Sequence, residues 1–201
     1  MSLVDTWAAT GAGAFSLSEN SLYTAEAWKL FLNRLTDDGL FTVSRWYSPE
    51  DIGETARLLS LGVTALLSLP VEKPSDHLAL ITSGRIATLL VCLRPFPQTD
   101  IQKLKKVCSD LGFLVVHLPG QPPREPLLHD IISVQTTEQL STAIADAELN
   151  CSPPTDESPY FFNMLRLRNI GVALSRPEGI IRGNLIATFT LLGLLLALLI
   201  V

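Results

Sequence analysis

The residue best placed for acid–base chemistry is Asp5, which directly follows the short apolar run Leu3-Val4. We interpret residues 1–5 as the end of a buried strand, followed by a loop rich in small residues over 6–20. In an open α/β sheet, ligands bind outside the carboxyl ends of the strands, where such loops begin. A carboxylate there can orient an amine and accept its proton. The alternative is that Asp5 only caps the turn after the strand.

Residues suited to metal or thiol chemistry are isolated from one another. Cys92, Cys108 and Cys151 are widely spaced and form no CxxC pair, so the sequence predicts neither a disulfide framework nor a metal site. Their apolar neighbours favour a role for Cys92 and Cys108 as small core residues. The three histidines show no ligand spacing, and we interpret each as a structural or surface residue.

The composition indicates one ordinary domain with an apolar tail. The chain has 201 residues, of which 17% are charged and 47% hydrophobic, and its mean hydropathy is +0.32. The charged fraction is below the usual quarter of a soluble domain. The net charge of −5 argues against a nucleic-acid partner, which would require a basic face.

The elements that must position Asp5 alternate between strands and helices. A helix is predicted from about Thr24 to Leu35, because apolar residues recur there at helical spacing, and a strand over 40–47. The strands at 1–5 and 40–47 would then be parallel. Ser48-Pro49 predicts the start of the next helix. Two apolar runs at 78–83 and 86–93 are too close to pair in any way but antiparallel.

The second half of the chain continues this pattern. Thr99 to Gln102 has the form of a capping box, which predicts a helix that ends at Gly112. A strand over 113–118 and helical segments within 127–149 complete the domain. Asn150 to Pro159 contains three prolines and is interpreted as a polar linker. The predicted divisions are therefore a domain over 1–149, a linker and juxtamembrane segment over 150–182, and a membrane helix over 183–201.

The C-terminal segment has the composition of a transmembrane helix. Residues 183–201 include no charged side chain, and at about 1.5 Å per residue they extend about 28 Å, close to the bilayer's hydrocarbon thickness. The alternative is a buried helix of a soluble core. Arginines precede the segment, so the positive-inside rule predicts an inner or plasma membrane location with the domain in the cytoplasm. A second interpretation makes Arg166 and Arg168 a patch for anionic lipids, and the two interpretations can hold together.

Two blocks of sequence resemble a known family. They are Asp5-Thr6-Trp7 with Gly11-Ala12-Gly13-Ala14-Phe15, continuing through Glu19–Thr24 to Trp28, and Ser152–Phe162. Both are similar to the membrane-fused branch of the spermidine synthase-like (aminopropyltransferase) family. The resemblance implies a partial doubly wound, methyltransferase-like Rossmann sheet with an antiparallel edge hairpin, followed by a C-terminal transmembrane helix.

The resemblance also implies a reaction. The family's acid, in a pattern of the kind Asp-Ser-Ser-Asp-Pro, falls on Asp5 as the catalytic proton acceptor, with Thr6 and Trp7 as substrate-binding residues. The donor would be decarboxylated S-adenosylmethionine or S-adenosylmethionine, the acceptor a small-molecule amine, with no intrinsic cofactor. Trp7 and Trp46 would wall a pocket for an apolar or cationic ligand, or serve only in packing.

The chain departs from the family's pattern at several points. The second acid of the motif falls on Ala8, and Ser44-Arg45-Trp46 stands where a glutamine often follows the next strand. A glycine-rich turn and an acid for the nucleotide would lie upstream, and Gly11-Ala12-Gly13 does not replace them. We therefore expect a fragment of a longer membrane protein, inactive alone and completed by an upstream half or a homo-oligomer. The alternative is a non-catalytic membrane module for sensing, transport or scaffolding.

Overall fold

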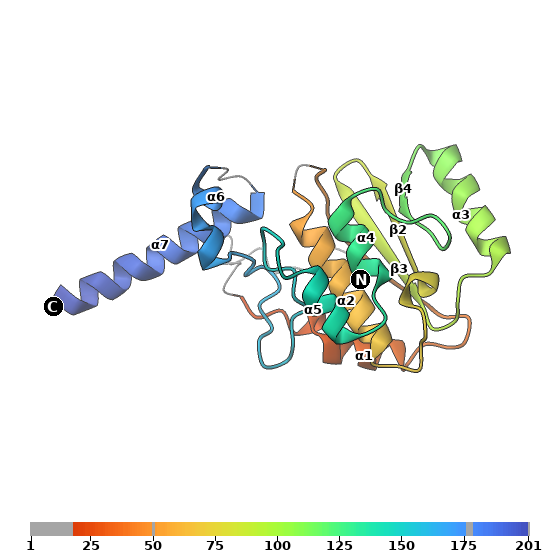
Figure 1. Cartoon of the computed structure of the whole chain (residues 1–201), viewed down its shortest axis with the longest axis horizontal. Helices are drawn as coiled ribbons and strands as arrows, with labels where there is room; N and C mark the ends of the chain where they lie inside the picture. The colour runs from red at the N-terminus through yellow and green to blue at the C-terminus, as the bar shows by residue number, and fades with distance from the viewer. Residues whose placement is uncertain (1–17, 50, 176–178, 201) are drawn as a thin grey trace.

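The computed structural model describes residues 18–49, 51–175 and 179–200 (Figure 1). This part of the chain forms a mixed α/β body with one sheet, and a long apolar helix extends away from it. The four strands of the sheet have the order β1-β3-β2-β4. Their bounds are β1 Leu40–Trp46, β2 Leu78–Ser83, β3 Ile86–Cys92 and β4 Leu114–His117.

Every pair of neighbouring strands in this sheet is antiparallel. The predicted hairpin is confirmed: β2 and β3 pair from Leu78–Val91 to Ser83–Ile86, and Gly84 adopts φ +54° in the turn. Because β3 lies between β1 and β2 and opposes both, β1 and β2 run parallel to each other. The predicted parallel pairing of residues 1–5 with 40–47 lies outside the described residues.

One face of the sheet is covered by four helices and holds the main core. These are α1 Ala25–Leu32, α2 Gly53–Leu67, α4 Pro126–Ser133 and α5 Thr137–Ala143. Side chains alternate along each strand, so that Val43, Leu80 and Leu89 point into this core. Thr24, where the sequence predicts the helix to begin, caps α1 by accepting a hydrogen bond from the Ala27 amide (3.2 Å).

The start of α2 differs from the prediction at Ser48. The helix begins at Gly53, because Ser48 and Asp51 form an isolated bridge and the Asp51 carboxylate accepts a hydrogen bond from the Gly53 amide (3.3 Å). An Asp side chain that bonds a backbone amide two residues ahead forms a turn in place of a first helical turn. The turn thus delays the helix by several residues.

The other face of the sheet carries α3, Gln98–Leu111, after the short helix η4, Pro74–His77. Ile101 of α3 packs with Ala79, Leu90 and Leu118 in a smaller core. Gly112 ends the helix with φ +69°, as predicted. The capping box at Thr99 is not confirmed, since α3 already begins at Gln98 and Pro97 occupies the N-cap without a side-chain bond.

Residues 150–164, which the sequence predicts as the beginning of a linker, pack against the body. Cys151, Phe161 and Phe162 belong to the main core. Near the start of α1, the Ala25 amide donates to the Pro154 carbonyl (2.9 Å), and the Asn20 amide donates to the Pro159 carbonyl (2.7 Å). This segment therefore closes the α1–α2 end of the core.

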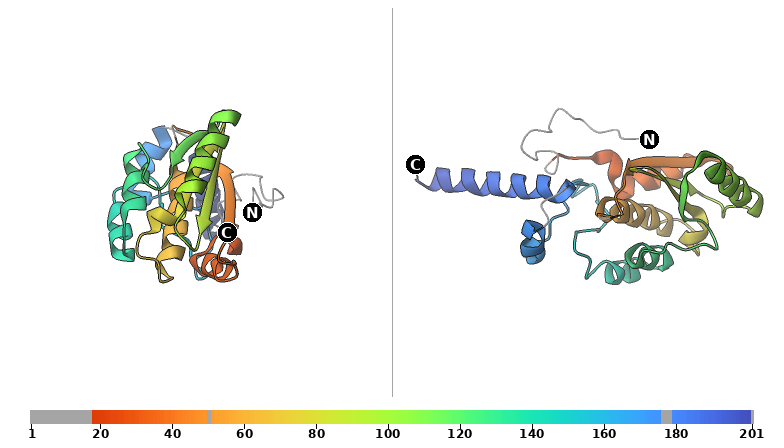
Figure 2. Two further views of the ribbon diagram at one scale, coloured as in Figure 1. Left: turned by 90° about the vertical axis from the view of Figure 1, so that its right-hand side faces the viewer. Right: turned by 90° about the horizontal axis from the view of Figure 1, so that it is seen from above.

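The chain then leaves the body through η5 (Leu167–Asn169), α6 (Ile170–Ser175) and α7 (Gly179–Ile200). Figures 1 and 2 show α7 extending away from the body at the end opposite to α3. Arg182–Ile200 is the one stretch within the described ranges that is long and apolar enough to cross a membrane. Most of its leucines are exposed in the described structure, while its first turns are buried.

Candidate functional site

The three residues that the sequence nominates for the reaction, Asp5, Thr6 and Trp7, lie outside the described part of the chain. The same holds for Ala8 and the glycines at 11 and 13. Trp46, the other aromatic residue proposed for the pocket, is 43% exposed at the end of β1. The carboxyl end of β1 is thus the described part of the predicted site, and its neighbour Arg45 has a definite environment.

Arg45 is fully buried beneath aromatic rings, with only 1% of its surface exposed. Its Nε donates to Glu54 Oε1 of α2 at 2.5 Å, and its Nη1 donates to the Tyr23 hydroxyl at 3.4 Å. The guanidinium carbon lies 4.8 Å from the centre of the Phe162 ring and 5.7 Å from that of Phe161. We call Tyr23, Arg45, Glu54, Arg57, Phe161 and Phe162 the arginine–aromatic cluster.

Arg57, one turn further along α2, fixes the 150–164 segment. Its Nε donates to the Ser152 carbonyl at 2.9 Å and its Nη1 to the Asn163 carbonyl at 2.7 Å. Burial lowers the pKa of Arg57 to about 10, so the side chain remains charged at neutral pH. Burial also raises the pKa of the adjacent Cys151 thiol to about 11, which keeps this thiol protonated and unsuited to nucleophilic attack.

The cluster has the composition of an anion or aromatic binding site, but its charges already have partners within the fold. Glu54 holds Arg45, and backbone carbonyls hold Arg57. Removing one partner of a buried ion pair leaves an uncompensated buried charge, which is strongly destabilising. The cluster therefore joins the turn that precedes α1, which contains Tyr23, to β1, α2 and the 150–164 segment.

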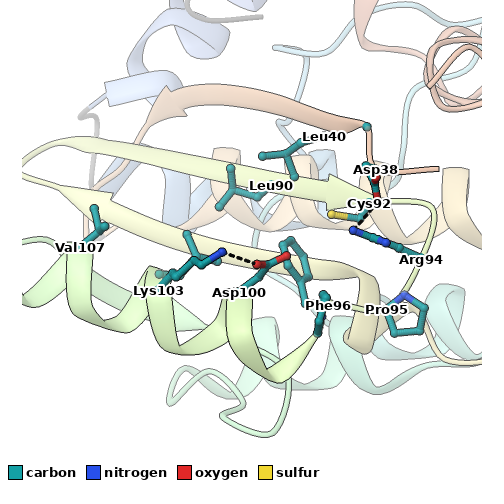
Figure 3. Close-up of a pocket in the computed structure, with 13 residues that line it drawn as sticks. Asp38, Leu40, Leu90, Cys92, Arg94, Pro95, Phe96, Asp100, Lys103 and Val107 are labelled. Atoms are coloured by element: carbon teal, nitrogen blue, oxygen red, sulfur yellow. Dashed lines mark hydrogen bonds and ion pairs between the residues drawn. The ribbon is translucent and has the colours of Figure 1, made fainter. Parts of the chain in front are cut away.

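A groove of about 320 Å³ lies on the opposite face of the sheet, between β1, β3 and α3 (Figure 3). Its floor is apolar and includes Leu40, Leu90 and Phe96. Arg94 pairs with Asp38 at one end, and Lys103 lies 3.4 Å from Asp100 along α3. Both pairs are largely exposed, so each contributes little to stability. The groove can hold an apolar group but presents no catalytic set.

The cysteine in this groove is not an activated nucleophile. Burial raises the pKa of the Cys92 thiol to about 11, with a smaller opposing effect from Arg94. Its backbone carbonyl lies 3.2 Å from Nδ1 of His77, and His117 Nε2 lies 3.0 Å from the Ser75 carbonyl. These contacts confirm the structural interpretation of His77 and His117. No group of potential metal ligands occurs in the described residues.

Sequence reasoning missed Glu54 and the role of Phe161 and Phe162. An acid in the first turn of a helix is ordinarily interpreted as a partner of the helix dipole. The position of Glu54 therefore does not indicate that it pairs with Arg45. The unusual feature is Arg45, the residue before the last in a strand whose other residues are mainly apolar or hydroxylated. A charge at such a position requires a buried partner of opposite sign, and this requirement was the available clue.

Comparison with other proteins gives no further assignment. The chain matches no protein-family model, no curated protein and no solved structure.

Proposed function

We propose that the chain is a membrane-anchored module of the spermidine synthase-like kind, which transfers a group from a nucleotide sulfonium to an amine. The observation that carries the proposal is the connection β1-α2-β2, in which the two strands run parallel with β3 reversed between them. An antiparallel hairpin following crossover units is the edge expected for a methyltransferase-type sheet. The sequence blocks around Asp5 and at Ser152–Phe162 support the same family.

The proposed chemistry is a nucleophilic substitution. The amine nitrogen attacks the carbon bound to the sulfonium sulfur, so that a C–N bond forms and the C–S bond breaks. The electron pair of the C–S bond goes to sulfur, which leaves as a neutral thioether. Asp5 accepts the proton that the amine loses, and Thr6 and Trp7 bind the acceptor. The donor is decarboxylated S-adenosylmethionine or S-adenosylmethionine.

The module is held by α7 in an inner or plasma membrane, with the body in the cytoplasm. The exposed leucines of α7 suit a lipid environment, because nothing in the described structure covers them. Arg182 is exposed at the start of the apolar stretch, and arginine at this position favours the cytoplasmic side.

The reaction is tested with the chain joined to its upstream half and reconstituted in lipid nanodiscs, because the chain alone is expected to be inactive. Calorimetry measures binding of each sulfonium, and chromatography measures the product formed from decarboxylated S-adenosylmethionine and putrescine. Loss of a positioned general base lowers turnover about 10²–10⁴-fold. We therefore expect the turnover of the Asp5→Asn variant to be lower than that of the wild type by this factor. Asp130→Asn, at an exposed position of α4, is the matched control and should leave turnover unchanged. Equal turnover of wild type and Asp5→Asn would contradict the assignment.

A second candidate is a non-catalytic sensing, transport or scaffold module with a degenerate transferase fold. The pairing of Arg45 with Glu54 favours it, because the charged residue at the end of β1 serves the fold. The motif's second acid is also replaced by Ala8. Tight binding of a sulfonium without turnover would support a sensor. The absence of both binding and turnover would support a transport or scaffold role.

A further inference from the structure

The beginning of α7 is part of the packed body. Gly183, Asn184, Leu185 and Ala187 are buried, and Leu185 packs with Leu149 and Met164. Asn184 Oδ1 accepts hydrogen bonds from the amides of Met164 (2.9 Å) and Leu165 (3.3 Å), while its Nδ2 donates to the Phe162 carbonyl (2.8 Å). The helix is therefore fixed to the segment that precedes η5.

The elements η5 and α6 lie beside these first turns. Figures 1 and 2 both place α6 next to the body end of α7, and the two helices are in contact. Two leucines of these elements are strongly exposed, Leu167 at 75% and Leu174 at 51%. Ile170 between them packs onto the cluster of Leu149, Met164 and Leu185, so the segment is attached to α7 by an apolar contact.

The packed first turns of α7 set the side of a bilayer on which this segment would lie. Arg182–Ile200 has the length and composition of a membrane span. Its first turns are buried against the body. In a bilayer crossed by this stretch, these turns and the elements that pack on them would therefore lie at the surface that faces the body.

The neighbouring arginines divide into two kinds. Arg166 donates to the carbonyls of Ile144 (2.9 Å) and Ala145, and Arg168 also donates to Ala145. These bonds satisfy carbonyls at the end of α5. Both arginines therefore bind the body, and a contact of the same arginines with anionic lipids stays a prediction. Arg182 is exposed at the start of the apolar stretch.

We propose that η5 and α6 form a second membrane contact, in which Leu167 and Leu174 enter the boundary between headgroups and acyl chains. This proposal rests on the insertion of α7. Its partner is the lipid bilayer, and the contact is continuous with the apolar surface of α7. Helices that lie in the membrane interface bury their apolar side chains about 5–10 Å into the boundary between headgroups and acyl chains.

The test places a polarity-sensitive fluorophore on single introduced cysteines in the full chain, reconstituted in phosphatidylcholine vesicles. The variants are Leu167→Cys, Leu174→Cys, Leu191→Cys in α7, and Leu111→Cys in α3. Leu111 is the matched control, because it is a helical leucine with 60% exposure at the end of the molecule opposite to α7. Burial raises the pKa of Cys92 and Cys151 to about 11 and also raises that of Cys108, so labelling at neutral pH favours the introduced thiols.

Quenching by lipids that carry a nitroxide near the headgroup is then measured. We expect quenching at positions 167 and 174 several-fold above that at 111, with position 191 quenched best by a nitroxide deep in the acyl chain. Quenching at 167 and 174 as weak as at 111, with 191 still quenched, would overturn the second contact and leave the membrane helix intact. Absence of quenching at 191 would overturn both the anchor and the contact that depends on it.

Discussion

The helices α2 and α7 are both long and both rich in leucine, yet they place polar and apolar groups in opposite ways. In α2, nearly every residue is buried, including the charged side chains Glu54 and Arg57. In α7, the leucines from Leu191 onward are about half or more exposed, and Asn184 is a buried polar residue near its start. Of these two leucine-rich helices, α2 therefore buries charged side chains, while α7 exposes apolar side chains.

The difference between α2 and α7 reflects the surroundings of each helix. Buried charges in α2 are tolerable because protein groups satisfy them: Arg45 for Glu54, and two backbone carbonyls for Arg57. Exposed leucines in α7 are tolerable only where water is replaced by lipid or by another apolar surface. The pattern of polar groups thus distinguishes a helix at the centre of a folded body from a helix that needs an external apolar environment.

The largest expected effect comes from leaving the buried acid of α2 without its cation. Arg45→Met should lower the free energy of unfolding by about 3–5 kcal/mol, because Glu54 remains buried without its ion-pair partner. Urea unfolding, followed by the fluorescence of the buried Trp28, measures the change. The double variant Arg45→Met/Glu54→Leu should recover much of the loss. A single variant as stable as wild type would show that the pair is not a structural requirement.

A charge introduced into α7 is expected to have a somewhat smaller effect, on membrane partition. Leu191→Arg places a cation near the middle of Arg182–Ile200, at a cost of about 2.5–3.5 kcal/mol of insertion free energy. The fraction of protein that stays with membranes after a carbonate wash should fall sharply. Leu111→Arg, which makes the same change at an exposed site of α3, should not alter this fraction. Identical behaviour of the two variants would contradict a lipid environment for α7.

The smallest effect concerns a hydroxyl of α2 that has no hydrogen-bond partner in the described structure. Ser60 is fully buried, and its Oγ is unsatisfied within these residues. Ser60→Ala should leave stability unchanged or raise it by up to about 1 kcal/mol, because no bond is lost. Thr24→Ala is the contrast, since the Thr24 hydroxyl donates to Asp156 Oδ1 (2.6 Å) and caps α1. Thr24→Ala should lower the free energy of unfolding by about 1 kcal/mol. A loss of stability larger for Ser60→Ala than for Thr24→Ala would contradict this prediction.

The elements predicted well from the sequence are those whose signals are local. The hairpin of β2 and β3 follows from two apolar runs joined by a turn at Gly84, and α7 follows from an uninterrupted apolar stretch. The start of α2 was predicted too early, because Ser48 has the composition of a cap but takes part in a turn with Asp51. Residue type alone does not distinguish these two uses of a polar side chain.

The candidate site was less predictable because its contacts join distant parts of the chain. Arg45 meets Glu54 nine positions later, while its aromatic cover comes from Phe161 and Phe162, and these partners converge only through the order of the strands. No periodic pattern encodes such contacts. The roles of Asp5, Thr6 and Trp7 stay predictions, since these residues lie outside the described structure.

The hydrogen bonds of Asn184 have a consequence for motion. A globular body on a loose tether can turn in all directions above a membrane. Here Asn184 fixes α7 to residues 162–165, and Arg57 fixes the same segment to α2. With α7 inserted as proposed, these bonds would hold the body at one height above the bilayer with one side towards the lipid. The body would then rotate freely only about the membrane normal, and a protein that diffuses in the same bilayer would meet it from one side.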